Sequence, residues 1–204
     1  MAKDAGLLII GDAKRGDISS TAAAYAQAIL SPDGPLGCDA ITLNPWMGSD
    51  TLSPFVSVCQ DHGRGLFALV RTTNPGSALL QHHGTPTAAH HLANTLHNLG
   101  TDLCGPRRLS AVGAVVGASA ADEAKVLRQL MPEAWFLVPG IGAQGGSADQ
   151  ALAGCRKDGM GALPVASRSV LFPNKPSVSY DTDPEGFIAS QVETLTGQVR
   201  EVWQ

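Results

Sequence analysis

The sequence predicts one α/β domain built on a parallel sheet. Short apolar runs of strand length alternate with longer segments of helical spacing along the whole chain. The runs are continuously apolar, as in strands that are covered on both faces, and Gly and Ala are abundant. A length of 204 residues suffices for one sizeable core but is short for two, so residues 1–204 are expected to form a single domain.

The expected elements follow one another as strand and helix. The strands are predicted at 7–11, 40–43, 65–70, 111–116, 135–138 and 162–165. The helices are predicted at 19–30, 52–62, 86–99, 120–131, 147–157 and 184–203. Several helices open on a Ser, Thr or Asp, and Thr85 before Pro86 is interpreted as an N-cap with proline in the first turn.

The composition excludes several classes of partner. The formal net charge is -4 and no basic block occurs, so nucleic acid is not expected as a partner. The N-terminus lacks the apolar stretch of a signal peptide, and no apolar run approaches the roughly 20 residues that span a bilayer. The four cysteines are widely spaced, with no Cys-x-x-Cys pair, and indicate reduced thiols. We therefore expect a soluble, cytoplasmic protein.

The choice between a doubly wound sheet and a (β/α) barrel depends on where polar residues fall. Six strands alone do not decide it, but polar residues follow many different strands, which is typical of the active face of a barrel. The polar residues are Asp12, Lys14, Asn44, Arg71, Thr72 and Arg168, and Gly140 occupies the corresponding position after another strand. A closed barrel has eight strands. The prediction is therefore an N-terminally incomplete (β/α)8 barrel of the TIM type in which about six βα units, strands 3 to 8, are present.

Asp12 and Lys14 are two positions apart at a strand end, so their side chains should lie on one face, where each stabilises the charged form of the other. Such a pair at the end of an apolar strand should be desolvated, which favours catalysis or ligand binding over a structural ion pair. Asp17, taken in isolation, is interpreted as the N-cap or a first-turn carboxylate of the helix that follows.

Four segments carry a family resemblance. Residues 10–21 read Ile-Gly-Asp-Ala-Lys-Arg-Gly-Asp-Ile-Ser-Ser-Thr, which resembles the Asp-x-Lys-x-x-Asp-Ile-x-x-Thr signature of orotidine 5'-phosphate decarboxylases of the bacterial type 2 branch. The shorter Asp-x-Lys-x-x-Asp pattern is shared with related sugar-phosphate enzymes. Further similarity lies in Asp-Ala-Ile-Thr-Leu-Asn-Pro at 39–45, Val-Arg-Thr-Thr-Asn-Pro-Gly at 70–76 and Val-Pro-Gly-Ile-Gly-Ala-Gln-Gly-Gly at 138–146.

This resemblance implies decarboxylation of orotidine 5'-monophosphate to uridine 5'-monophosphate, in pyrimidine biosynthesis, without metal or cofactor. Lys14 corresponds to the proton donor for the C6 carbanion, and Asp12 to the carboxylate near the leaving group. Asp17 corresponds to a residue that reaches the partner's site across a homodimer interface, and Thr21 to a ribose contact there. The resemblance thus implies a homodimer with shared active sites.

The same resemblance implies the remaining substrate contacts. Arg168 would bind phosphate, which suits a bidentate guanidinium, and Gln144 would bridge phosphate and pyrimidine. The pyrimidine edge would be read by Thr72 or Thr73, with the inward-pointing member left open. The further expected substrate contacts are Asn44 and Pro139, although turn chemistry explains Asn44 about equally well. Ser169 stands where relatives usually have glycine.

Two alternatives remain open at this stage. The chain could be an Mg-dependent sugar-phosphate lyase of the same superfamily, or a catalytically inactive, truncated nucleotide-binding subunit, because a family lysine on an earlier strand is not in this sequence. Six histidines occur, but no carboxylate or cysteine joins them at ligand spacing, and no metal site is predicted.

Overall fold

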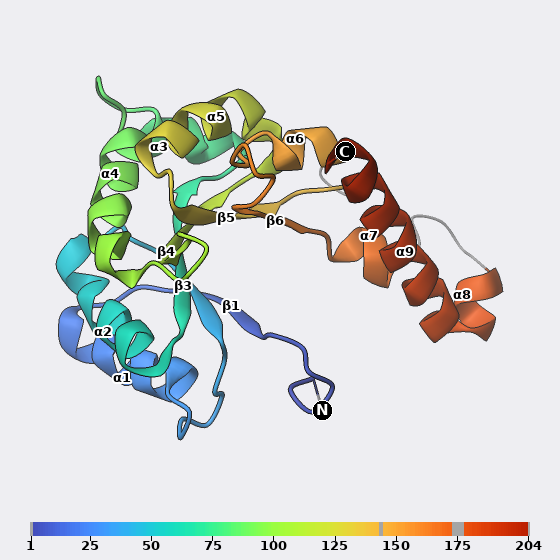
Figure 1. The fold of residues 1–204 in the computed structure, drawn as a ribbon, viewed down its shortest axis with the longest axis horizontal. Coiled ribbons are helices and arrows are strands. Elements are labelled where there is room, and N and C mark those ends of the chain that lie inside the picture. Colours follow the sequence, from blue (N-terminus) through green and yellow to red (C-terminus); the bar gives the residue numbers. More distant parts are fainter. Residues whose placement is uncertain (1, 143–144, 173–177, 204) are drawn as a thin grey trace.

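The structure is a computed structural model that describes residues 2–142, 145–172 and 178–203. Six parallel strands form one sheet in the order β1-β2-β3-β4-β5-β6, so each strand pairs with its neighbours in sequence (Figure 1). The strands are β1 (Ile10–Arg15), β2 (Ala40–Leu43), β3 (Gly65–Arg71), β4 (Ser110–Val116), β5 (Ala134–Pro139) and β6 (Ala162–Val165). The predicted parallel α/β fold is confirmed, with the bounds of β2 and β6 as expected.

The first strand was predicted in the wrong place. It begins at Ile10 rather than at residue 7, because Leu7 and Leu8 are 61% and 85% exposed and contribute nothing to the core. It then runs past Gly11 to Arg15, where a shift of register against β2 interrupts the ladder. The charged segment predicted to follow the strand is therefore part of it.

Most helices confirm the predicted order. They are α1 (Ser19–Leu30), α2 (Ser53–His62), α4 (Ala88–Gly100), α5 (Ala121–Leu130), α6 (Ala148–Leu152) and α9 (Pro184–Trp203). Shorter helices that the sequence did not predict are α3 (Ala78–Gln81), α7 (Arg168–Leu171) and α8 (Val178–Thr182). Single 3-10 turns occur at η1 (Ser49–Thr51), η2 (Pro75–Ser77), η3 (Thr101–Leu103) and η4 (Ala118–Ala120).

Two helix boundaries differ from the prediction by more than one residue, for local reasons. The cap of α4 is Thr87, whose hydroxyl accepts a hydrogen bond from the His90 N–H, so the assignment of Thr85 as cap was wrong. Helix α6 stops at Leu152, well before residue 157. Just beyond it, Gly154 approaches the ring of Phe136 so closely that a methyl group would lie 2.8 Å from a ring carbon.

The two faces of the sheet are covered differently. The larger core cluster joins one face to the helices, through strand residues such as Ile41, Leu66 and Phe136 and helix residues such as Leu30 and Leu127. The buried members of the smaller cluster come from strands alone and are Ala40, Phe67, Val115 and Leu137. A sheet with helices on one face and strand side chains packed together on the other is a curved barrel wall. The part of the chain described here therefore forms six units of a (β/α) barrel rather than a doubly wound sheet.

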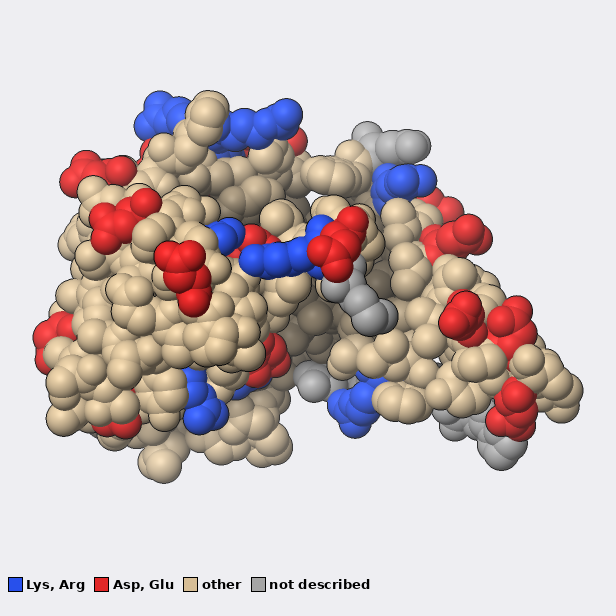
Figure 2. Space-filling view, turned by 90° about the horizontal axis from the view of Figure 1, so that it is seen from below, with Lys and Arg blue, Asp and Glu red and all other residues tan. Residues whose placement is uncertain are grey.

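The C-terminal helices project from one edge of this wall, although Leu195 of α9 packs against the larger core cluster (Figure 1). Helix α9 packs on α6, α7 and α8, and the pair α8 and α9 projects away from the sheet (Figure 1). Figure 2 shows a hollow between the main body and this projecting part, with acidic and basic groups interspersed on a largely uncharged face. Among the described helices, none has both the length and the apolar composition to cross a membrane.

Candidate active site

Asp12 and Lys14 form the closest charged contact at the carboxyl edge of the sheet. The Lys14 ammonium Nζ lies 2.5 Å from Asp12 Oδ1, so the predicted pairing on one face is confirmed. The predicted desolvation is wrong for the described residues, because the side chains of Lys14 and Asp12 are 48% and 63% exposed. The pair therefore lies open to solvent at the mouth of the barrel wall, where a ligand can reach it.

Thr42, on the neighbouring strand β2, supports this pair and was not predicted. Its side chain is fully buried, and its hydroxyl Oγ1 donates to Asp12 Oδ1 at 2.8 Å. The same oxygen accepts the backbone N–H of Lys14 at 3.0 Å. A threonine within an apolar strand looks like an ordinary β-branched core residue, so this role has no signal in the sequence.

The hydrogen bonds to Asp12 affect its ionisation. Partial burial raises the pKa of Asp12, but the hydrogen bonds from Lys14 and Thr42 and the charge of Lys14 together lower it below its ordinary value of 3.8. The carboxylate is therefore ionised at neutral pH. Its second oxygen, Oδ2, accepts no hydrogen bond from the described residues.

Asp17 lies between β1 and α1 and does not cap the helix. The N-cap of α1 is Ile18, which has no side-chain cap, and the Asp17 carboxylate accepts the Ile18 N–H at 2.8 Å. The N-cap interpretation was therefore wrong. Within the described ranges, Asp17 forms no ion pair with Lys14 of the same chain. Thr21 is half-buried in the first turn of α1.

Gly16 and Asn44 bring the ends of β1 and β2 together. The Asn44 N–H donates to Arg15 O at 2.8 Å, and a methyl group at Gly16 would lie 2.6 Å from Asn44 O. Only glycine fits such a close backbone approach. The Asn44 side chain accepts the Trp46 N–H at 3.1 Å, which is the turn role that the sequence left open.

Thr72 and Thr73 lie at the end of β3 and differ in their surroundings. The Thr72 hydroxyl donates to Asn74 Oδ1 at 2.7 Å and accepts from Gln81 Nε2 at 2.8 Å, so it belongs to a local network. Thr73 is exposed and lies against Gly117 at the end of β4, where a methyl group on Gly117 would meet its Cγ2 at 2.4 Å. Thr73 is therefore the member whose hydroxyl is not engaged by the described residues.

The loop after β5 meets the start of α7. Pro139 ends β5, and the glycine turn behind it is held by bonds such as Gly146 N–H to Gly140 O at 3.0 Å. Arg168 begins α7 and is exposed, with no ion pair to another described residue. Gln144 lies outside the described residues.

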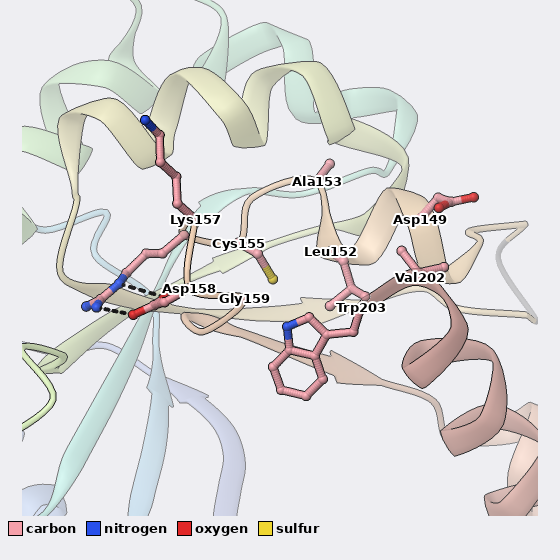
Figure 3. A pocket seen from close by; sticks show the side chains of 10 residues that line it. Asp149, Leu152, Ala153, Cys155, Lys157, Asp158, Gly159, Val202 and Trp203 are labelled. Carbon is pink, nitrogen blue, oxygen red and sulfur yellow. Dashed lines mark hydrogen bonds and ion pairs between the residues drawn. The ribbon is translucent and has the colours of Figure 1, made fainter.

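Two pockets mark the wider surroundings. A cavity of about 670 Å³ lies beside Asn44 and Thr72 and is lined mainly by apolar groups, among them Trp46 and Leu69. Another pocket, in Figure 3, lies between α6 and the end of α9, where Trp203 faces Gly159 and the Cys155 thiol points inward. This pocket contains none of the predicted site residues. Within the described ranges, no three His, Cys, Asp or Glu side chains are grouped to hold a metal ion.

The fold defines a class: a (β/α)-barrel protein, in which ligand sites lie at the carboxyl edge of the strands. Residues 1–182 match the family model described as "Orotidine 5'-phosphate decarboxylase / HUMPS family", and the chain belongs to this family. The resemblance predicted from the sequence is thus confirmed.

Individual relatives agree with this assignment. The orotidine 5'-phosphate decarboxylase of Rhodopirellula baltica is 43% identical over 180 residues, which cover 85% of this chain and 60% of the relative. That of Deinococcus radiodurans is 41% identical over 172 residues, covering 84% of this chain and 61% of the relative. The chain therefore spans about three fifths of the length of these curated relatives.

Solved structures show the same fold. The OMP decarboxylase of Leishmania donovani superposes with a TM-score of 0.70 at 34% identity, covering 96% of this chain and 70% of that one. A protein of Streptomyces avermitilis superposes with a TM-score of 0.81 at 33% identity. The superposition covers 99% of this chain and 67% of the Streptomyces chain.

Proposed function

We propose that this chain carries the reacting face of a cofactor-independent orotidine 5'-monophosphate decarboxylase that forms uridine 5'-monophosphate in de novo pyrimidine biosynthesis. The observation that carries the proposal is the 2.5 Å contact between Lys14 Nζ and Asp12 Oδ1 at the carboxyl edge of the sheet. The names of the relatives support the same substrate. The substrate is a charged, water-soluble nucleotide, which supports a cytoplasmic location.

The proposed chemistry needs one acid and one oriented carboxylate. The bond between C6 and the substrate carboxylate breaks, carbon dioxide leaves, and the electron pair remains on C6 as a vinyl carbanion. The Lys14 ammonium donates a proton to C6 and is later reprotonated from solvent. A cation next to C6 stabilises charge that is greater in the transition state than in the substrate, which is the requirement for a rate increase.

Asp12 has two roles in this scheme. It orients Lys14 through their shared contact, and its ionised carboxylate faces the substrate carboxylate that is about to leave. The free oxygen Oδ2 suits the second role because Oδ1 already accepts from Lys14 and Thr42. Loss of carbon dioxide then relieves the repulsion between the two carboxylates.

The remaining contacts follow the strand ends. Arg168 is proposed to bind the phosphate as a bidentate donor near the glycine turn after Pro139. Gln144 is proposed to bridge the phosphate and the pyrimidine. Thr73, whose hydroxyl is free of described partners, is proposed to read the pyrimidine edge, with Thr72 and Asn44 shaping the wall next to it. Asp17 and Thr21 are proposed to serve the partner's site in a homodimer. This agrees with the bond that Asp17 makes to Ile18 rather than to its own Lys14.

An Mg-dependent sugar-phosphate lyase is less well supported, since the curated relatives are named decarboxylases. The other alternative is a subunit that binds nucleotides without turnover, and the experiment must distinguish it from an active decarboxylase.

The test follows the fall in orotidine 5'-monophosphate absorbance with the purified 204-residue chain. Wild type is expected to turn over, and Lys14→Ala to lose at least about 1000-fold in kcat, because the proton donor is gone. Lys125→Ala is the matched control, since Lys125 is an exposed lysine paired with Asp122 on α5, and it should leave the rate unchanged. Equal rates in Lys14→Ala and wild type would reject the role of Lys14. Calorimetric binding of uridine 5'-monophosphate without turnover would favour the nucleotide-binding alternative.

A further inference from the structure

We propose that Thr42 is a positioning residue that fixes both the backbone of Lys14 and the carboxylate of Asp12 through one buried hydroxyl. The inference rests on the proposed decarboxylase function for its catalytic consequence. Its structural part can be measured without turnover.

The hydroxyl of Thr42 both donates and accepts a hydrogen bond. It has one proton to donate and two lone pairs that accept, and its proton and one lone pair bind the reacting segment. Oγ1 accepts the Lys14 backbone N–H at 3.0 Å and donates to Asp12 Oδ1 at 2.8 Å. Lys14 Nζ then donates to the same Oδ1 at 2.5 Å. A closed ring of hydrogen bonds therefore runs from the backbone of Lys14 through Thr42 and Asp12 to the ammonium of Lys14.

This ring holds Lys14 in an uncommon backbone conformation. Lys14 has φ of +46°, in the left-handed region that residues with a side chain rarely adopt. The register of β1 against β2 shifts between Gly11 and Arg15, so Lys14 lies within an irregular part of the ladder. Strain of this kind persists only where the surroundings hold it in place, and a bulge re-aims side chains. Among the described residues, the Thr42 hydroxyl is the hydrogen-bond acceptor for the Lys14 N–H.

The position favours threonine over other residues of its size. Thr42 is fully buried, while Asp12 and Lys14 are largely exposed, so a buried side chain supports two groups that face solvent. A β-branched side chain has a restricted χ1 angle and suits a strand, which limits the directions open to the hydroxyl. Valine would fill the same space but could neither donate nor accept. The Lys14 N–H and one lone pair of Asp12 Oδ1 would then lose their partner.

The experiment compares Thr42→Val, Thr42→Ser and a matched control. Thr42→Val is expected to lower kcat about 10- to 100-fold, as for an ångström-scale misplacement of a catalytic group, with KM changed less than about threefold. Thr42→Ser restores the hydroxyl and should recover most of kcat. Thr51→Val is the control, because Thr51 is also buried and donates its hydroxyl to Gly48 O away from the pair. It should leave kcat unchanged, and thermal unfolding should show that all variants are folded.

A second measurement separates this inference from the proposed function. Amide hydrogen exchange, followed by NMR, should show the Lys14 N–H protected in wild type and Thr42→Ser and unprotected in Thr42→Val. If wild type shows no turnover, the decarboxylase proposal fails, while loss of this protection in Thr42→Val still supports the positioning role. If wild type is active, equal kcat in Thr42→Val overturns the inference. Fast exchange of the Lys14 N–H in wild type overturns it in every case, including one in which Thr42→Val does not fold.

Discussion

A methyl group on Gly142 would lie 3.0 Å from both Cβ and Oγ of Ser169. The glycine turn after β5 therefore lies close to Ser169, the residue next to Arg168. Gly142 has φ of +72°, a conformation that favours glycine. Both this backbone conformation and the nearness of Ser169 therefore require glycine at this position. Two segments far apart in the sequence thereby form one corner of the carboxyl edge.

This corner predicts the effect of Arg168→Ala. Loss of the guanidinium should weaken binding of uridine 5'-monophosphate about 10- to 100-fold, the range for a charged hydrogen bond to phosphate. Isothermal titration calorimetry measures the affinity directly. Arg200→Ala, an exposed arginine on α9, serves as control and should bind as wild type does. Unchanged affinity in Arg168→Ala would remove Arg168 from the phosphate site.

The shared active site is tested by mixing two inactive variants. Lys14→Ala and Asp17→Ala chains should each lack activity, because each removes one member from every site. In the proposed shared site, Lys14 of one chain works with Asp17 of the other. Unfolding and refolding an equimolar mixture should then restore about a quarter of wild-type activity, because half of the dimers are mixed and each has one complete site. Refolding either variant alone is the control. A mixture that stays inactive although size-exclusion chromatography shows dimers would contradict a site shared in this way.

The lowered pKa of Asp12 predicts the acid side of the pH profile. Burial alone would raise this pKa, but Lys14 and Thr42 lower it below 3.8, so Asp12 is ionised throughout the working range. A carboxyl with a lowered folded pKa stabilises the native state above its unfolded pKa. That contribution disappears as the pH falls through the folded value. We therefore expect kcat/KM to show no acid limb from Asp12 above about pH 5. An acid limb at higher pH that coincides with the ¹³C titration of the Asp12 carboxyl would contradict the assignment.

Arg128 is predicted to stabilise the fold rather than the site. Its guanidinium donates to the carbonyls of Gly154 at 2.7 Å and Gly161 at 2.8 Å, and lies 4.0 Å from the ring centroid of Phe136. Burial lowers the pKa of Arg128 to about 10, so the group stays protonated at neutral pH.

Arg128→Met should lower the free energy of unfolding by about 2–4 kcal/mol, because several carbonyls lose their donor and the cation–π contact is lost. Urea denaturation measures the change. Lys125→Met, on the exposed side of the same helix, should change stability by less than about 0.5 kcal/mol. A similar small change in Arg128→Met would show that these bonds contribute little.

The sequence predicted those parts of the fold that depend on local patterns. Continuous apolar runs located β2 and β6, and helical spacing of apolar residues located α1 and α9, because both patterns are local properties of the sequence. The predicted contact between Asp12 and Lys14 also held. The alternation of a regular strand does not explain it alone, because Lys14 has a left-handed backbone conformation in an irregular part of β1. The family followed from residue types and their order, which are properties of the sequence itself.

Other features depend on contacts between distant segments and were decided only by the tertiary structure. Leu7 and Leu8 look like strand residues, but no neighbour covers them, and the strand begins at Ile10. In the sequence, Thr42 looks like a core residue and Arg128 looks like an exposed residue of a helix. In the structure, the Thr42 hydroxyl binds Asp12 on another strand, and the Arg128 guanidinium lies over the ring of Phe136. Sequence patterns predict local secondary structure and burial. Hydrogen bonds between strands depend instead on the register and curvature that packing imposes. The physical reason is that burial and hydrogen-bond partners belong to the folded arrangement and not to any single segment.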